Sequence, residues 1–268
     1  MMKKLVSSIV LLLTISVAFA VDNYKKVACT GGFRGHLQGI EAHNGKIFWS
    51  HTHNLIRTDS NGVIEKYIDA PYHHGDICIH NNKLYVAVNL GVFDQKKGAK
   101  NSVWIYDLDL NFIKKIPIKE FEGGLGGIEY YNGSFYLVGG IHNSYKQFPL
   151  YKYDENFNLQ KEYLFDVAET VCGIQTICWA YGRFWLGVYL NKESIHTNLR
   201  LWETDENLKI IKKHKIDAST GIAPIENADG ANFLIARAHC KRQKLPEMKY
   251  SCHWAEVYPL KIIPTETK

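Results

Sequence analysis

The 268-residue chain lacks the features of several protein classes. Beyond residue 20 no stretch reaches the roughly 20 apolar residues that a transmembrane helix needs. Neither a His-x-x-x-His nor a Cys-x-x-Cys spacing occurs, and these are common patterns of zinc sites. The 32 basic residues nearly balance the 27 acidic ones. This balance gives no case for a nucleic-acid partner or a membrane surface.

The first 20 residues form a segment of their own. Lys3 and Lys4 precede an apolar run over residues 5–17, and the small-residue motif Ala18-Phe19-Ala20 precedes Val21. This pattern is typical of a cleaved secretory signal peptide. We therefore predict a signal over residues 1–20 and a single monomeric domain over residues 21–268. The predicted location is outside the cytoplasm, either periplasmic or extracellular.

One pattern occurs five times: a small or polar residue, an isoleucine, a few strand residues, an Asn-Gly-like turn and, in most copies, an aromatic-rich strand. The isoleucines are Ile40, Ile77, Ile128, Ile177 and Ile225. The turns end at Gly45, Asn82, Gly133, Gly182 and Gly230. Successive turns are 37, 51, 49 and 48 residues apart, close to the roughly 40–50 residues of one propeller blade. The sequence predicts an all-β, five-bladed β-propeller with four-stranded blades around a central channel.

The later strands of each unit follow the same plan. The third strand of the first four units ends at an acidic turn, and a fourth strand closes the blade. The fifth unit is incomplete, with strands expected over residues 233–238 and 253–258. We predict that residues 24–28 supply or support its outer strand and close the ring; residues 260–263 compete for that place.

All six cysteines lie after the predicted signal, an even number that is compatible with disulfides in an exported protein. Cys240 and Cys252 bracket the longest loop of the fifth unit, and Cys29 follows the strand expected beside them. We predict at least one bridge among these three. Cys78 and Cys178 share a repeat position two blades apart, and a bridge between them would need Cα atoms within about 7 Å.

Histidines gather on one predicted face of the ring. The loops that enter each blade and the loops between second and third strands open on this face, and they carry nine of the twelve histidines. These nine are His36, His51, His53, His73, His74, His142, His196, His239 and His253. We predict one ligand site at this mouth of the channel, with five ligand-binding residues: His36, Gln38, His74, Gln175 and His239.

Acidic residues recur on the inner strands, on the side opposite the isoleucines. Aligning the repeats places Glu41, Glu129 and Glu226 in one column and Asp76 two residues earlier, facing the same way. Four carboxylates in a narrow channel need a cation, basic partners or shared protons. We predict Glu41, Asp76 and Glu129 as catalytic acids, or all four as ligands of Ca²⁺ or another divalent ion. Alternatively, they accept hydrogen bonds from neighbouring backbone amides and brace the ring.

Two motifs carry a resemblance to a known family. Gln38-Gly39-Ile40-Glu41 and Gly75-Asp76 resemble motifs of the plant- and bacterial-type glutaminyl-peptide cyclotransferases, which are exported five-bladed propellers. The resemblance implies cyclisation of an N-terminal glutamine with loss of ammonia. It also implies that Glu41 or Asp76 shuttles a proton from the attacking amine to the departing one.

Other chemistries fit the same ring. A hydrolase or lyase could use such an acid–base pair on a small polar substrate, and a lectin-like propeller would bind a glycan or peptide without turnover. Multivalent lectins repeat a site in every blade, whereas the loops here differ strongly in length. One asymmetric site is therefore favoured over five equal ones.

Overall fold

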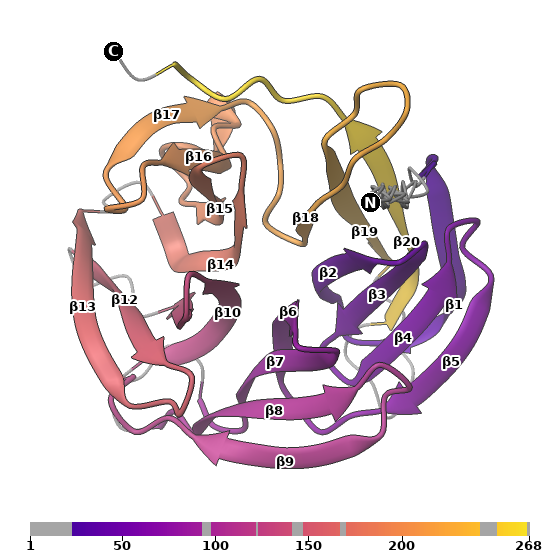
Figure 1. The fold of residues 1–268 in the computed structure, drawn as a ribbon, viewed down its shortest axis with the longest axis horizontal. Coiled ribbons are helices and arrows are strands. Elements are labelled where there is room, and N and C mark those ends of the chain that lie inside the picture. Colours follow the sequence, from indigo (N-terminus) through magenta and orange to yellow (C-terminus); the bar gives the residue numbers. More distant parts are fainter. Residues whose placement is uncertain are drawn as a thin grey trace, which may run out of the picture.

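The computed structural model describes residues 23–92, 98–121, 123–140, 147–166, 170–241 and 251–266. Their strands form five four-stranded antiparallel sheets arranged as a ring around a central axis (Figure 1). The predicted five-bladed propeller is confirmed. The predicted signal over residues 1–20 and His142 lie outside the described residues. Within the described part of the chain, no helix is long and apolar enough to cross a membrane.

The first four blades each use four consecutive strands, from the channel outward. Blade one contains β2 (Leu37–His43), β3 (Lys46–His51), β4 (Asn54–Asp59) and β5 (Ile64–Asp69). Blade two contains β6 (His74–His80), β7 (Lys83–Asn89), β8 (Asn101–Asp107) and β9 (Phe112–Pro117). Blade three contains β10 (Gly124–Tyr131), β11 (Ser134–Gly140), β12 (Gln147–Asp154) and β13 (Leu159–Asp166). Blade four contains β14 (Thr170–Ala180), β15 (Arg183–Leu190), the short 3₁₀ helix η1 (Ile195–Thr197), β16 (Leu201–Thr204) and β17 (Ile210–His214).

Blade five joins the two ends of the described chain. Its inner strands are β18 (Ile222–Pro224), β19 (Phe233–Lys241) and β20 (Ser251–Leu260), and its outer strand is β1 (Val27–Arg34). β1 pairs antiparallel with β20, so the N-terminal segment closes the ring as predicted. The strand begins at Val27, three residues later than predicted. The preceding Tyr24 backbone is held by the Asn227 side chain, which accepts from its N–H at 2.8 Å and donates to its carbonyl at 2.7 Å.

The predicted acidic turns are present in the first four blades. The turn residues are Asp59, Asp107, Asp154 and Asp205. In each turn, one carboxylate oxygen accepts the backbone N–H groups of the residues two and four positions later, at 2.8–2.9 Å. An acidic side chain in this position satisfies backbone donors that the turn leaves unpaired.

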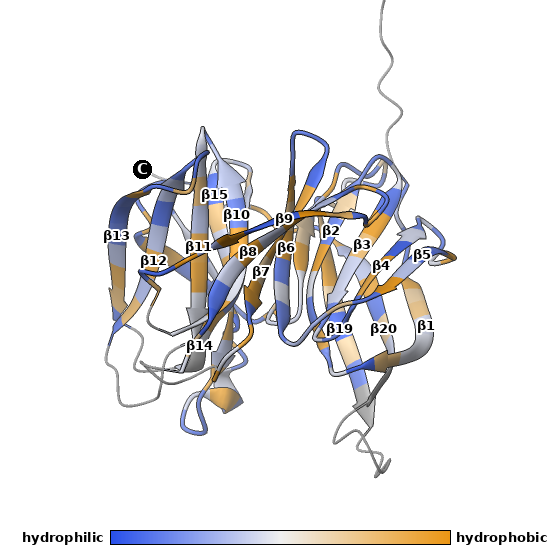
Figure 2. Cartoon of the chain, turned by 90° about the horizontal axis from the view of Figure 1, so that it is seen from below, coloured by the Kyte–Doolittle hydropathy of each residue, from blue (hydrophilic) through white to orange (hydrophobic). Residues whose placement is uncertain are grey.

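The repeated isoleucines pack between neighbouring blades. Ile40 of blade one lies in a cluster with Leu234 and Ala236 of blade five, and Ile177 of blade four contacts the cluster of Val138 in blade three. All five isoleucines are at most 5 % exposed. Hydrophobic stretches lie within the strands, whereas the hairpin tips at the upper edge of the view are mostly hydrophilic (Figure 2). The apolar column therefore holds the blades together, and the opposite side of each inner strand faces the channel.

The predicted bridge among Cys29, Cys240 and Cys252 stays a prediction. Cys29, Cys78 and Cys178 are free and buried. The backbone register of β19 and β20 places Cys240 opposite Cys252, and the side chains of these two residues lie outside the described ones. Because Cys29 is free, Cys240–Cys252 is the predicted pairing that remains.

Candidate functional site

Three loops meet at one mouth of the channel, on the face where the chain enters each blade. They are the β1–β2 loop with His36, the β3–β4 loop with Thr52, and the β5–β6 loop with His73. The Thr52 N–H donates to the His36 carbonyl at 3.0 Å, and the His74 N–H donates to the Thr52 carbonyl at 3.1 Å. These backbone bonds fix the loops of blades one and two against each other.

Gln38 lies at the centre of this mouth and is only 3 % exposed. Its Nε2 atom lies 2.8 Å from Nε2 of His36 and 2.6 Å from Nε2 of His73. Oγ1 of Thr52 lies 3.2 Å from the same atom, but an amide NH₂ group has two hydrogens, and the two closer imidazoles accept both of them. With the amide nitrogen assigned to this position, each ring accepts at Nε2 and carries its proton on Nδ1. One side chain thus orients two imidazoles that come from different loops.

These imidazoles are neutral at pH 7. Burial lowers the pKa of His36, and burial together with the nearby His36 lowers the pKa of His73 to about 3. His51, behind them, has a pKa lowered to about 3 by the same two causes. Both ring nitrogens of His51 are buried without a hydrogen-bond partner among the described residues, and its ring lies 4.5 Å from that of Phe33. A buried imidazole without hydrogen-bond partners strongly favours its neutral form.

Tyr72 stands at the rim of the mouth, 50 % exposed. Its ring lies 5.1 Å from that of His73 and 5.3 Å from that of His53. An aromatic ring held in this way offers a stacking surface beside polar groups. Tyr72, Thr52 and His73 were absent from the predicted ligand set; the only sequence signal for them was their place in the loops of the histidine-rich face.

The other predicted ligand residues lie elsewhere. His74 is fully buried, its Nδ1 donating to the Pro71 carbonyl at 2.8 Å and its Nε2 lying 2.9 Å from the Tyr106 hydroxyl. His239 stacks on Trp254 in blade five, with ring centroids 3.6 Å apart. Gln175 is buried on β14 beside Gly126, where an added Cβ would lie 3.6 Å from its Oε1. Of the five predicted ligand residues, His36 and Gln38 form the mouth network.

Glu41, Asp76 and Glu129 converge within the channel, as the repeat column predicted. Burial raises the pKa of Glu129 to about 8. The pKa values of Glu41 and Asp76 lie well above their usual range because of burial and of the neighbouring carboxylates. Burial and the same carboxylates also raise the pKa values of the Cys78 and Cys178 thiols. The channel therefore disfavours negative charge.

Backbone amides hold these carboxyl groups. Oε2 of Glu129 accepts from the Trp179 N–H at 2.9 Å, and its Oε1 accepts from the Tyr130 N–H at 2.6 Å. Oδ2 of Asp76 accepts from the Ile177 N–H at 3.0 Å, which ties blade two to blade four. Oε1 of Glu41 accepts from the N–H of the next residue at 2.9 Å. This is the bracing arrangement that the sequence left open as an alternative.

Asp76 differs from Glu129 in one respect. Its Oδ1 is buried and has no hydrogen-bond partner within the described part of the chain. This atom packs against Gly39, the residue after Gln38, where a Cβ would lie only 2.2 Å away. A glycine is required at this position because the carboxyl group occupies the space of a side chain. Asp76 therefore lies directly beneath the mouth network with one oxygen uncommitted.

The predicted four-carboxylate metal set does not assemble. Glu226 is exposed, whereas Glu129 is buried and Glu41 is half-buried. Across the ranges that the structure describes, no group of three or more His, Cys, Asp or Glu residues is arranged to hold a metal ion. The residues present do not fit the predicted Ca²⁺ site.

No protein-family model and no curated protein matches the sequence. Among solved structures, a chain from the crystal structure of a nidogen/laminin complex is similar with a TM-score of 0.47 and 9 % identity, over 71 % of this chain and 68 % of that one. A protein of unknown function from Bacteroides caccae is similar with a TM-score of 0.46 and 12 % identity, over 76 % of this chain and 100 % of that one.

Proposed function

We propose that this protein is an exported propeller that binds a small polar substrate at the mouth formed by His36, Gln38, Thr52 and His73, and acts on it by acid–base catalysis. The observation that carries the proposal is the Gln38 amide, which holds two neutral imidazoles together while His36 stays partly exposed. A neutral imidazole with its proton on Nδ1 donates a hydrogen bond to a carbonyl or hydroxyl oxygen without bringing a charge into the site.

The proposed proton carrier is Asp76. It lies beneath the mouth, has one uncommitted oxygen, and stays protonated at pH values where an ordinary aspartate is ionised. A carboxyl group with a raised pKa exchanges protons near neutral pH, which is the property that a general acid–base group needs. Glu129, with both oxygens bonded to backbone N–H groups, supports the channel wall instead.

The specific reaction we propose is cyclisation of an N-terminal glutamine, as the resemblance of the Gln38 and Asp76 motifs implies. The α-amine attacks the side-chain amide carbon, the bond to the amide nitrogen breaks, and ammonia leaves. One proton passes from the attacking amine to the departing nitrogen, and Asp76 relays it. His36 polarises the amide oxygen from its Nδ1–H.

Peptides with an N-terminal glutamine test this reaction, with ammonia release and the mass of the product as readouts. We expect turnover by the wild-type protein, loss of turnover in Asp76→Asn, and a raised KM in His36→Phe. Lys114→Met, on the exposed outer strand β9, is the control and retains activity. Wild-type protein that releases no ammonia would rule out the cyclase reaction, and full turnover by Asp76→Asn would rule out the proposed proton carrier.

Carbohydrate binding without turnover is the second candidate, and Tyr72 is the observation that favours it. An exposed aromatic ring beside a dense set of hydrogen-bonding groups suits the apolar face of a sugar. Saturation-transfer NMR with simple methyl glycosides tests it. Binding lost in Tyr72→Ala and retained in Phe112→Ala, an equally exposed ring on β9, would support this reading.

A further inference from the structure

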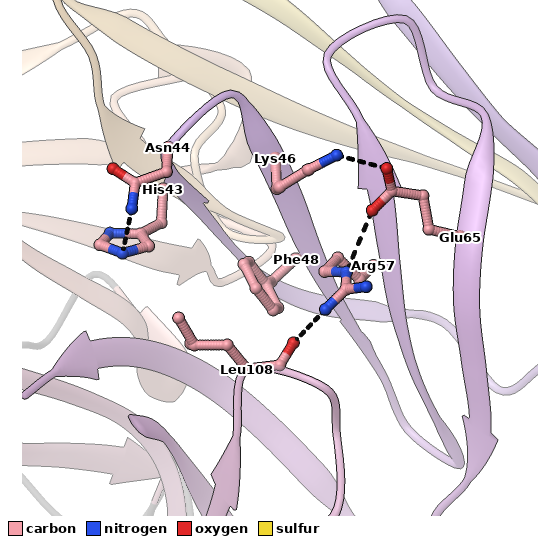
Figure 3. Close-up of a pocket in the computed structure, with 7 residues that line it drawn as sticks. All are labelled: His43, Asn44, Lys46, Phe48, Arg57, Glu65 and Leu108. Carbon is pink, nitrogen blue, oxygen red and sulfur yellow. Dashed lines mark hydrogen bonds and ion pairs between the residues drawn. The ribbon is translucent and has the colours of Figure 1, made fainter. Parts of the chain in front are cut away.

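A pocket lies on the opposite face of the ring from the histidine-rich mouth. It has a volume of about 560 Å³ and is formed between blades one and two. Its lining residues are His43, Asn44, Lys46, Phe48, Arg57, Glu65 and Leu108 (Figure 3). This volume is in the range of pockets that bind small organic molecules. None of these residues belongs to the mouth network.

The pocket has an apolar part and a charged part (Figure 3). The buried Phe48, of which only an edge lines the pocket, and the partly exposed Leu108 lie between the His43–Asn44 pair and a charged group made by Lys46, Glu65 and Arg57. Glu65 bridges the two cations, with one oxygen on Nζ of Lys46 and the other 3.1 Å from Nε of Arg57. The charged residues of the lining carry a net charge of +1, which Asp109, paired with Arg57 from outside the lining, offsets.

Arg57 is fixed in place from outside the pocket as well. Its Nη1 donates to the Leu108 carbonyl at 2.6 Å and to Oδ1 of Asp109 at 2.7 Å. The hydrogen bond to Asp109 raises the pKa of this guanidinium, so the residue is cationic at any working pH. These contacts use Nε and Nη1, and a guanidinium has five N–H donors in all. The described residues supply no hydrogen-bond acceptor to Nη2.

Lys46 has spare capacity too. An ammonium group has three donors, and its one hydrogen bond to another described side chain is to Glu65. Lys46 and Arg57 thus both have unused donors, and a single carboxylate bridges them beside the apolar part of the pocket. Two such cations form a site for a second carboxylate. A cationic ligand would leave these donors without an acceptor.

We infer that this pocket binds an organic acid that has one carboxylate and one apolar group. The carboxylate binds at Lys46 and Arg57, and the apolar group packs against Phe48 and Leu108. Glu65 acts as a built-in competitor, because it already neutralises part of the cationic charge. This site is independent of the proposed function at the mouth.

Three probes with the same apolar group but different charge test the inference on the full mature protein: 3-phenylpropionate, 3-phenyl-1-propanol and 3-phenylpropylamine. Binding is measured by calorimetry and ligand-observed NMR at low ionic strength, where partly exposed charges are least screened. We expect the acid to bind roughly three- to tenfold more tightly than the alcohol, as one partly exposed ion pair allows, and the amine to bind most weakly.

Substitutions separate this site from general surface binding. Lys46→Met keeps the length of the side chain and removes the preference for the acid, whereas Glu65→Gln strengthens binding of the acid. A role of Glu65 in structure alone would not strengthen it. Lys114→Met, on the exposed outer strand β9, is the matched control and changes nothing. Equal binding of acid and amine, no tightening in Glu65→Gln, or no binding of any probe at millimolar concentration would each overturn the inference.

Discussion

Glu129→Gln is expected to destabilise the protein, whereas Asp76→Asn leaves its stability close to that of the wild type. Both oxygens of Glu129 accept part-buried backbone N–H groups, one in its own blade and one in blade four. A glutamine has only one acceptor oxygen, so its NH₂ group would face one of these donors. Leaving a buried donor unpaired costs about 1–3 kcal/mol.

Asparagine fits at position 76 because Asp76 uses one oxygen and leaves the other without a partner in the described structure. The carbonyl oxygen of the amide can accept from the Ile177 N–H, and the NH₂ group takes the place of the unpartnered oxygen, which in the protonated form of Asp76 already carries an unpaired O–H donor. The substitution also removes a group that resists ionisation in the channel. We expect a change in the free energy of unfolding within about 1 kcal/mol.

Thermal and urea unfolding of the two variants measure this difference. In a domain of this size a loss of 1 kcal/mol lowers the Tm by roughly 2–4 °C. Phe112→Ala on an exposed outer strand controls for the effect of a surface substitution. If Glu129→Gln matched the wild type while Asp76→Asn unfolded, the assignment of bracing to Glu129 and of an uncommitted oxygen to Asp76 would be reversed.

The stability of the protein is expected to pass through a maximum between about pH 4.5 and 6.5. Glu129 has a pKa of about 8 when folded and 4.5 as its ordinary value. Because its pKa is raised on folding, Glu129 adds to the free energy of unfolding. This contribution is fully present below pH 4.5 and is lost as the pH rises through 8. Asp76 acts in the same direction, because burial holds its pKa well above 3.8.

The buried histidines act in the opposite direction. His51 and His73 have pKa values of about 3 and His74 of about 4, against an ordinary value of 6.5. A lowered pKa contributes stability that is complete above pH 6.5 and is lost as the pH falls through 4 and 3. Below pH 4.5 the histidine effect dominates, and above pH 6.5 the carboxyl effect dominates. Each group contributes a slope of up to about 1.4 kcal/mol per pH unit.

Urea unfolding between pH 4 and 9 measures this profile, and two variants assign its limbs. Asp76→Asn flattens the alkaline limb. His51→Leu flattens the acidic limb and raises stability there, because it replaces two buried, unpartnered ring nitrogens with apolar atoms. A stability that rises steadily from pH 6 to pH 9 would contradict the raised pKa values in the channel.

The fold could be predicted because its determinants are local and repeated. Each of the first four blades has one repeated isoleucine, one Asn-Gly-like turn and one acidic turn. Every copy therefore supports the same strand order. The closing strand was predicted because the fifth repeat is incomplete and needs an outer strand from elsewhere in the chain. Its start at Val27 was not, because that boundary depends on how Asn227 holds the Tyr24 backbone more than 200 residues away.

The site was only partly predictable, because its contacts join loops and atoms that the repeat does not encode. His36 and Gln38 are two residues apart, but the contact from Gln38 to His73 spans 35 residues and depends on the packing of two loops. The repeat column correctly brought Glu41, Asp76 and Glu129 together. It could not show which oxygen meets which amide, nor that Glu226 would be exposed.

A crystallographic screen of small polar fragments against the mature protein tests the central claim most directly, since that claim concerns where a ligand binds. We predict that fragments gather at the mouth, in contact with the Tyr72 ring and within hydrogen-bonding distance of His36. Fragments that bind the pocket on the opposite face or the outer strands while the mouth remains filled only by water would contradict the account.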